Sequence, residues 1–319
     1  PSLPPSLPSH ILPAADCRVY TPSNPNGMFA NVTDSIDLFV LAHFFGSLGK
    51  TIILRDWRIV WTLLTLWEVV EYTFQFMLPN FMECWFDHWV IDVFGFNLAG
   101  VLVGLAICHY FAFKNYNWTG IAGLSWRRVL GQFSPYEWHT YNWNLFSTSR
   151  RFFAVTVAIV LFEVVELNAF FLKYVLYVPP SHRLNAYRLT FWFLLAIPAF
   201  REYYHYATDS ACKRFGPNLW LALALMSVEL MVVLKFGWHL DSFSKTPPAP
   251  VIWGWACFAA CLALWTTLRF DLIKAGPAPA TSVLVRKALV AGGVVSLAGI
   301  VMTQEVGWGV VGRAQPDGW

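Results

Sequence analysis

Eight long apolar stretches constrain the fold of this chain more than any other feature. A bilayer core about 30 Å thick is crossed by a helix of roughly 20 apolar residues. Of the 319 residues, 57% are hydrophobic and only 13% are charged. Backbone groups in lipid must be satisfied within their own segment, so these stretches are expected to be helices. The fold is therefore predicted to be all-α, a polytopic transmembrane helical bundle of about eight spans, near 36–54, 58–78, 89–112, 153–177, 188–206, 218–237, 251–270 and 283–303.

Three segments follow from this pattern. Residues 1–34 are rich in Pro and Ser and are predicted to be a non-helical N-terminal segment, residues 35–305 a single transmembrane domain, and residues 306–319 a C-terminal tail. Between the third and fourth spans, Asn115–Arg151 is rich in Trp, Tyr and Arg. Aromatic and basic side chains favour the headgroup zone, so an interfacial loop and helix region is predicted there, with an ordinary connecting loop equally compatible.

The charge distribution predicts sidedness. A net charge of +3 is too small to indicate a nucleic-acid partner. Basic residues crowd alternate connections, so the positive-inside rule predicts that the first, third, fifth and seventh spans end in the cytosol. The turn at 79–88 then faces the opposite compartment.

The cysteines form no CxxC pair and are interpreted as packing residues: Cys17, Cys84, Cys108, Cys212, Cys257 and Cys261.

Four carboxylates occur where a membrane protein tolerates them least. Glu68 and Glu71 interrupt an apolar helix, and Asp87 and Asp92 flank the start of the next one. An ionised side chain at membrane depth costs roughly 2.5–3.5 kcal/mol, so it usually faces a cavity, a counter-ion or a metal. Carboxylate oxygens suit a hard cation such as Ca²⁺ better than Zn²⁺. These four residues are predicted metal ligands, with Asn97 as a further oxygen donor.

His43 is singled out among the eight histidines by its position near the non-cytosolic end of the first span. A lone His in a helix is more often a packed residue than a catalytic one. Its predicted depth matches that of the glutamates, and the nearby Gly46 and Gly49 permit close helix approach. A neutral imidazole there could accept a proton from an incoming nucleophile. His88 and His109 lack this combination and are not candidates on these grounds.

The residues alone leave three classes of function open. The D-G-x-x-A-R run of CDP-alcohol phosphotransferases and the Walker loop are both absent. What remains is a membrane enzyme with a carboxylate-lined metal site, a cation-coupled membrane transporter with a carboxylate-lined ion site, or a non-catalytic scaffold. Trp67-Glu-Val-Val-Glu recurs as Phe162-Glu-Val-Val-Glu, which is compatible with transporter repeats and also with chance.

One segment, Met77-Leu-Pro-Asn-Phe-Met-Glu-Cys-Trp-Phe-Asp-His-Trp-Val-Ile-Asp, carries a specific resemblance. It resembles the eukaryotic phosphatidylserine synthase family of base-exchange type, whose hallmark is L-P-N-F-x-E-C-W-[WF]-D. Further matches extend over about 30–240, in Ala42–Gly46, Glu166–Lys173 and Ile197–Tyr203. The start of the chain is more similar to plant and algal members. The N-terminal transmembrane helices of the family are missing, so the chain is expected to begin part-way through a longer protein.

This resemblance implies a calcium-dependent phospholipid base-exchange enzyme of the endoplasmic reticulum membrane. Such a phosphatidyltransferase replaces the headgroup of phosphatidylethanolamine or phosphatidylcholine with L-serine, giving phosphatidylserine. A homodimer is one assembly compatible with this family. His43 would act either as a general base or as a covalent nucleophile. The implied catalytic residues are His43, Glu68 and Asp92, the substrate-binding residues Asn80, Asp87, Arg201 and Asp209, and the Ca²⁺ ligands Glu68, Glu71, Asp87 and Asp92.

Overall fold

The computed structural model describes residues 17–22, 24–36, 38–112, 141, 143–179, 181–209, 211–274 and 280–311. Within these ranges the chain is helical and has no strand, which confirms the all-α prediction. The elements are α1 (Ala30–Asp34), α2 (Leu38–Leu54), α3 (Trp57–Phe74), η2 (Pro79–Phe81), η3 (Asp87–Asn97), α4 (Leu98–Ala112), α6 (Ser149–Val175), α7 (Arg183–Thr208), α8 (Pro217–Gly237), α9 (Asp241–Ser244), α10 (Ala249–Lys274) and α11 (Ala280–Val311).

A helix occupies each of the eight predicted span positions, but the helices differ in membrane character. Five described segments are long and apolar enough to cross a bilayer: Asp87–Tyr110, Ser149–Val175, Pro217–Gly237, Ala249–Phe270 and Val283–Gln304. The apolar part of α2 is shorter, at Phe39–Leu54. Arg58, Glu68 and Glu71 lower the apolar character of α3, and four charged residues do the same in α7. The number of eight spans therefore stays a prediction.

The predicted terminal segments differ in detail from the structure. The N-terminal segment, predicted to be non-helical, contains the short helix α1. At the other end α11 continues to Val311, past the predicted start of the tail at 306. A helix adds one backbone hydrogen bond for each residue it gains, so it often extends beyond its apolar stretch. Most of the predicted interfacial region, 113–140, lies outside the described residues.

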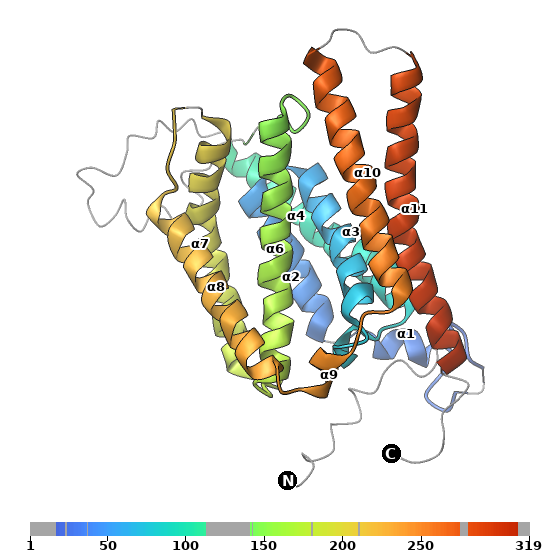
Figure 1. Ribbon diagram of the computed structural model, residues 1–319. Coiled ribbons are helices and arrows are strands. Elements are labelled where there is room, and N and C mark those ends of the chain that lie inside the picture. The colour runs from blue at the N-terminus through green and yellow to red at the C-terminus, as the bar shows by residue number, and fades with distance from the viewer. Residues whose placement is uncertain are drawn as a thin grey trace. The chain divides into compact units, whose positions relative to one another are not determined.

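The chain divides into two compact units. The first contains Pro1–Ser35, Leu66–His88 and Asp241–Trp319, and the second contains Ile36–Thr65 and Trp89–Leu240. In the first unit, α10 and α11 form a long antiparallel hairpin (Figure 1). Side-chain hydrogen bonds attach the end of α3 to this hairpin: Trp255 Nε1 donates to Thr73 Oγ1 over 2.9 Å, and Gln75 bonds Gln304 over 2.6 Å.

The core of the second unit is built from aliphatic and aromatic side chains of α2, α3, α6 and α7. Val60 and Leu63 of α3 are fully buried. Val155 and Ala158 of α6 and Tyr203 of α7 belong to the same cluster. In a bilayer such side chains gain van der Waals packing rather than release from water, and this packing favours the rotation that α3 adopts.

Glycines of α4 bring α2 and α4 together. A Cβ atom on Gly100 would overlap the Ser47 hydroxyl and the Phe44 carbonyl of α2, and one on Gly104 would lie 2.7 Å from Thr51 Cβ. The two backbones therefore approach closely where α2 carries His43. The sequence-based expectation assigned this role to α2 itself. It is wrong for Gly46, which faces open space, whereas Gly49 does lie against the Phe193 ring of α7.

Substitution of Gly100 by Ala is expected to destabilise the protein by about 1–3 kcal/mol, the usual cost of overpacking, because a backbone carbonyl must move. Gly46→Ala adds the same methyl group to open space and should leave stability unchanged or slightly improved. Thermal unfolding of the two purified variants in one detergent measures the difference. An equal melting temperature for both variants would show that the α2–α4 contact is not tight.

Candidate active site

A buried cluster of two glutamates and one histidine forms where α3 meets the start of η3. Glu68 and Glu71 are three residues apart on one face of α3, with exposed fractions of 0% and 4%, and His88 is also fully buried. The His88 Nδ1 atom lies 2.8 Å from Glu68 Oε2 and 3.2 Å from Glu71 Oε2. An ionised carboxylate can only accept hydrogen bonds, so Nδ1 carries a proton in this arrangement.

Aromatic side chains hold this cluster in place. Trp67 Nε1 donates a 2.7 Å hydrogen bond to Glu71 Oε1, one helical turn further along α3. The Tyr72 ring lies 4.5 Å from the His88 ring, centroid to centroid. Phe81 of η2 packs edge-on against Trp67. These contacts hold the Glu71 carboxylate and the His88 ring in place, which an unsupported group of buried charges could not maintain.

The cluster has the donor atoms for a divalent cation. One oxygen from each glutamate and one His88 nitrogen lie within 4.8 Å of one another. The other imidazole nitrogen, Nε2, is buried and has no hydrogen-bond partner among the described residues. A buried polar atom in this state usually marks a site that takes a ligand or a water. The two carboxylates fit a hard cation, whereas the imidazole nitrogen is the donor that Ca²⁺ prefers least.

Two more carboxylates lie within electrostatic reach of the cluster. Glu83 is half-buried in the segment between α3 and η3, and Asp87 is the first residue of η3. Burial raises the pKa of Glu83 well above its usual range, and the neighbouring Glu71, Asp87 and Glu68 charges raise it further, against the lowering effect of His88. Like charges so close together favour either a retained proton or a bound cation.

A disulfide joins Cys17 to Cys84, next to Glu83. This corrects the sequence-based interpretation of all six cysteines as packing residues. The error has a physical cause, because 67 residues separate the two and no spacing rule relates them. The other cysteines in the described residues are free: Cys108, Cys212, Cys257 and Cys261. Disulfides persist in oxidising compartments, which agrees with the non-cytosolic side predicted for the 79–88 turn from charge.

A second acid–base pair joins α2 to η3. His43 Nε2 lies 3.5 Å from Asp92 Oδ2, with side-chain exposures of 17% and 4%. η3 is a π-helix over Asp87–Asn97, a geometry that is rare and frequent at functional sites. The sequence analysis listed both residues as catalytic and Asp92 also as a Ca²⁺ ligand. The structure brings their side chains together, and their roles stay predictions.

Arg201 and Asp209, both predicted to bind substrate, have other surroundings. Burial lowers the pKa of Arg55, and the nearby Arg201 lowers it further. The Arg55 guanidinium covers the Tyr141 ring at 4.4 Å. Arg55 follows His43 by twelve residues, about 18 Å along a helix. Asp209 ends α7, where its Oδ1 accepts a 2.8 Å hydrogen bond from the Ala211 amide.

The structure locates the remaining predicted site residues but does not test their roles. Asn80 lies half-buried in η2, and Asn97 is buried at the end of η3. His88 is the residue that the sequence analysis missed. Its signal was position, since it directly follows Asp87 at the start of an apolar helix. The roles predicted for Asn80, Asp87, Arg201 and Asp209 stay predictions, as do the metal roles of Glu68, Glu71 and Asp92.

Comparison with known proteins supplies the family. The model of the family described as phosphatidyl serine synthase matches residues 6–237. The chain belongs to this family. It is 39% identical over 258 residues to CDP-diacylglycerol–serine O-phosphatidyltransferase 2 of Oryza sativa subsp. japonica, covering 79% of this chain and 60% of the relative. It is 36% identical over 263 residues to phosphatidylserine synthase 2 of Homo sapiens, covering 81% and 54%.

A third relative has a similar identity and coverage. CDP-diacylglycerol–serine O-phosphatidyltransferase 1 of Arabidopsis thaliana is 40% identical over 247 residues, covering 75% of this chain and 58% of the relative. The chain thus spans between about half and three fifths of the length of the curated relatives it matches. The site residues from His43 to Asp209 all lie within the matched range 6–237.

Loss of the Cys17–Cys84 disulfide is expected to destabilise the protein by about 2–4 kcal/mol, because the bond restricts a long loop in the unfolded chain. Cys84→Ser should lower the melting temperature, and Cys257→Ser, at an exposed free thiol, should not. Peptide mapping without reductant should recover the Cys17 and Cys84 peptides as one species. Alkylation of both thiols in unreduced protein would contradict the bond.

Calcium is expected to raise the melting temperature, and to raise it more as the pH increases. The carboxyl of an unfolded Glu ionises near pH 4.3, whereas Glu83 keeps its proton to higher pH when folded. At a pH between the unfolded and the folded pKa of Glu83, a cation must displace the proton of this carboxyl. Cation binding therefore strengthens as the pH rises through the folded pKa. Thermal unfolding with Ca²⁺ or chelator, from about pH 5 to about pH 8, measures the effect.

The variant Glu83→Gln is the control for this experiment. It removes the competing proton, so the calcium-induced rise in melting temperature should depend less on pH in this variant than in the wild type. A calcium effect that is largest at acidic pH in the wild type would contradict the interpretation of Glu83.

Proposed function

We propose that this protein exchanges the headgroup of a membrane phospholipid, replacing ethanolamine or choline with L-serine to form phosphatidylserine. Membership of the phosphatidylserine synthase family supports serine and a phospholipid as the substrate classes. The observation that carries the reaction type is the His43–Asp92 pair, an imidazole beside a buried carboxylate. A positioned imidazole of this kind is the usual general base for activating a hydroxyl.

In this mechanism Asp92 orients the imidazole and His43 moves the proton. Asp92 Oδ2, 3.5 Å from Nε2, favours the neutral tautomer with its proton on Nε2, so the lone pair is on Nδ1. Nδ1 takes the proton of the serine hydroxyl as its oxygen bonds to phosphorus. The bond from phosphorus to the headgroup oxygen breaks, and the proton passes to that leaving oxygen. One phosphodiester replaces another, so the step is close to thermoneutral and requires no nucleotide.

The Glu68–Glu71–His88 cluster supports Ca²⁺ as a cofactor, with the glutamates as ligands and Asp87 as an additional one. A bound cation would offset the phosphate charge and stabilise the negative charge that develops in the transition state. The residues contribute the rest: the hydrogen bond from Trp67 keeps Glu71 oriented. The disulfide beside Glu83 and the charge pattern support a calcium-rich, oxidising compartment, so we propose a multi-pass protein of the endoplasmic reticulum membrane.

The names of the relatives make a second phosphatidyl donor worth testing. The rice and Arabidopsis relatives are named for CDP-diacylglycerol, and the human one is named only as a phosphatidylserine synthase. With CDP-diacylglycerol as donor the same His43–Asp92 pair would activate serine, and cytidine monophosphate would leave. We favour the phospholipid donor because the sequence lacks the D-G-x-x-A-R run of CDP-alcohol phosphotransfer.

The purified protein is expected to incorporate labelled L-serine into phosphatidylethanolamine or phosphatidylcholine vesicles and to release the headgroup when Ca²⁺ is present. Excess chelator should abolish this exchange, and Zn²⁺ should not restore it. Incorporation only into vesicles that contain CDP-diacylglycerol would show that CDP-diacylglycerol, and not a phospholipid, is the donor. Calcium-coupled serine uptake by proteoliposomes without a new lipid would favour the transporter.

Substitution of His43 by Ala should lower turnover by roughly 10²–10⁴-fold, the usual loss with a general base, while melting temperature stays close to wild type. Asp92→Asn should reduce turnover less, because the amide can still orient the ring. Gly46→Ala, one turn from His43 in open space, is the matched control. Wild-type turnover in the His43 variant would make His43 a packing residue, and a trapped lipid–His43 adduct would favour the covalent route.

A further inference from the structure

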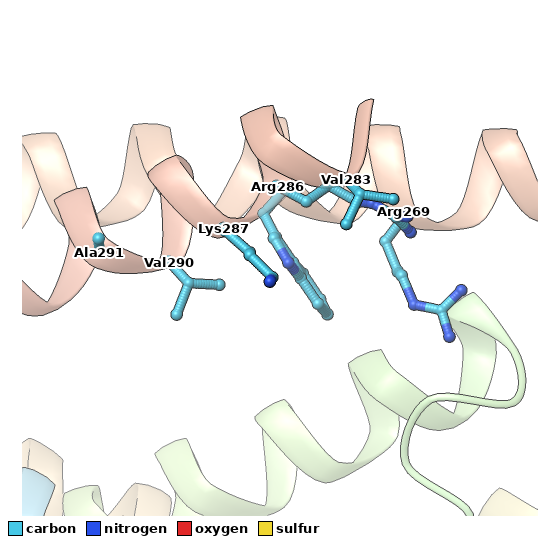
Figure 2. A pocket seen from close by; sticks show the side chains of 7 residues that line it. Arg269, Val283, Arg286, Lys287, Val290 and Ala291 are labelled. Atoms are coloured by element: carbon cyan, nitrogen blue, oxygen red, sulfur yellow. The ribbon is translucent and has the colours of Figure 1, made fainter. Parts of the chain in front are cut away.

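The α10–α11 hairpin has an open pocket beyond the residues that the family model matches, which end at 237. The pocket has a volume of about 430 Å³. Figure 2 shows Arg269, Lys287 and Val290 pointing to one side of the hairpin. Its described lining comprises three cations, one indole and three small apolar side chains, and no acid: Trp265, Arg269, Val283, Arg286, Lys287, Val290 and Ala291.

The packing of the two helices brings the cations to one level. A Cβ on Gly254 of α10 would collide with Ile300 of α11, and one on Gly292 would touch Cys261 Sγ at 3.3 Å. In this antiparallel register a step forward on α10 is a step backward on α11. Arg269, eight residues after Cys261, is therefore opposite residue 284, within a turn of Arg286. Two helices thus contribute to one cationic site.

The cations lie inside the apolar segments rather than in the connection between them. Arg269 lies five residues before the end of α10 (Ala249–Lys274), and Lys287 lies seven residues after the start of α11 (Ala280–Val311). At 1.5 Å per residue Lys287 is about 10 Å along α11 from its first residue. A cation at that depth is costly unless it extends to the interface or meets an anion there.

The surroundings of the cations match a phospholipid in shape and polarity. Below the charged groups, α11 presents apolar side chains to the exterior, with Val290, Val294 and Val295 at exposures of 51%, 62% and 70%. Trp265 adds an indole, which favours the boundary between headgroups and acyl chains. Basic pockets between transmembrane helices on the cytosolic side are known to bind anionic headgroups.

We propose that this pocket binds the phosphate-bearing headgroup of an anionic phospholipid of the surrounding membrane, with an acyl chain along the exposed valines of α11. Arg269 and Lys287 contact the phosphate, and Arg286 adds to the positive potential. The excess of positive charge favours a lipid with net negative charge over a zwitterionic one. The charge pattern assigns this end of the hairpin to the cytosolic leaflet, where such lipids are enriched.

Binding is tested on the full chain in detergent with short-chain phosphatidylglycerol, phosphatidylcholine or inorganic phosphate as the probe. Wild-type protein should bind phosphatidylglycerol at least tenfold more tightly than phosphatidylcholine, with an affinity that falls as salt increases. The variant Arg269→Gln/Lys287→Gln should lose this preference. The matched control is Lys213→Gln/Arg214→Gln, which removes two exposed charges on the same predicted side of the membrane and should keep the preference.

Each other outcome has a defined meaning. Equal binding of the two lipids by wild-type protein, or an unchanged preference in the Arg269/Lys287 variant, overturns the proposal. Inorganic phosphate that binds as tightly as the lipid would make the site one for free phosphate and also overturn it. If the variant does not fold, a photoreactive phosphatidylglycerol decides on wild-type protein, since crosslinks should map to α10 and α11. Serine exchange is measured separately, and its absence would not affect these binding results.

Discussion

The cost of burying charge in an apolar environment is the constraint on which the rest of this structure depends. Its helices carry acidic and basic side chains at positions that an isolated helix in lipid could not tolerate, and partners from other elements neutralise them. Lys50 of α2 meets Glu166 of α6 over 2.5 Å, and Arg188 of α7 meets Glu229 of α8 over 2.6 Å. The glutamates of α3 meet His88 in the same way. Helix rotation and pairing are thereby specified by charge as well as by shape.

The same constraint explains why the chemically useful groups are so well positioned. A buried carboxylate that accepts a tryptophan N–H cannot rotate without losing that hydrogen bond in a medium that offers no water. Glu71 is in this situation, and its second oxygen lies 3.2 Å from His88 Nδ1. The aspartate beside His43 is similarly buried on a π-helix. Preorganised groups of this kind need little rearrangement when a charged phosphodiester binds, so the free-energy cost of reorganisation is small.

The two ends of the predicted topology are specialised differently. On the side assigned as non-cytosolic, acidic residues, a disulfide and the Pro79–Phe81 turn form one compact region of the first unit. On the side predicted to be cytosolic, cations and an indole line the end of the α10–α11 hairpin. Acidic groups suit a divalent cation from a calcium-rich compartment, and basic groups suit the anionic inner leaflet. Family residues account for the first region, whereas the second lies beyond residue 237.

The sequence by itself located the long helices along the chain, because apolar length must match the bilayer, although α7 and α11 extend beyond their predicted limits. The stretch predicted at 218–237 differs from α8, Pro217–Gly237, by one residue. The local motif around Asn80–Asp92 also determined the family. Only the tertiary structure decided that His88 joins Glu68 and Glu71, that Cys17 bonds Cys84, and that Gly100 rather than Gly46 permits the approach to α2. These are pairings between residues far apart in the chain. They depend on how each helix is rotated about its axis, which hydropathy leaves undetermined when a helix is apolar on all sides.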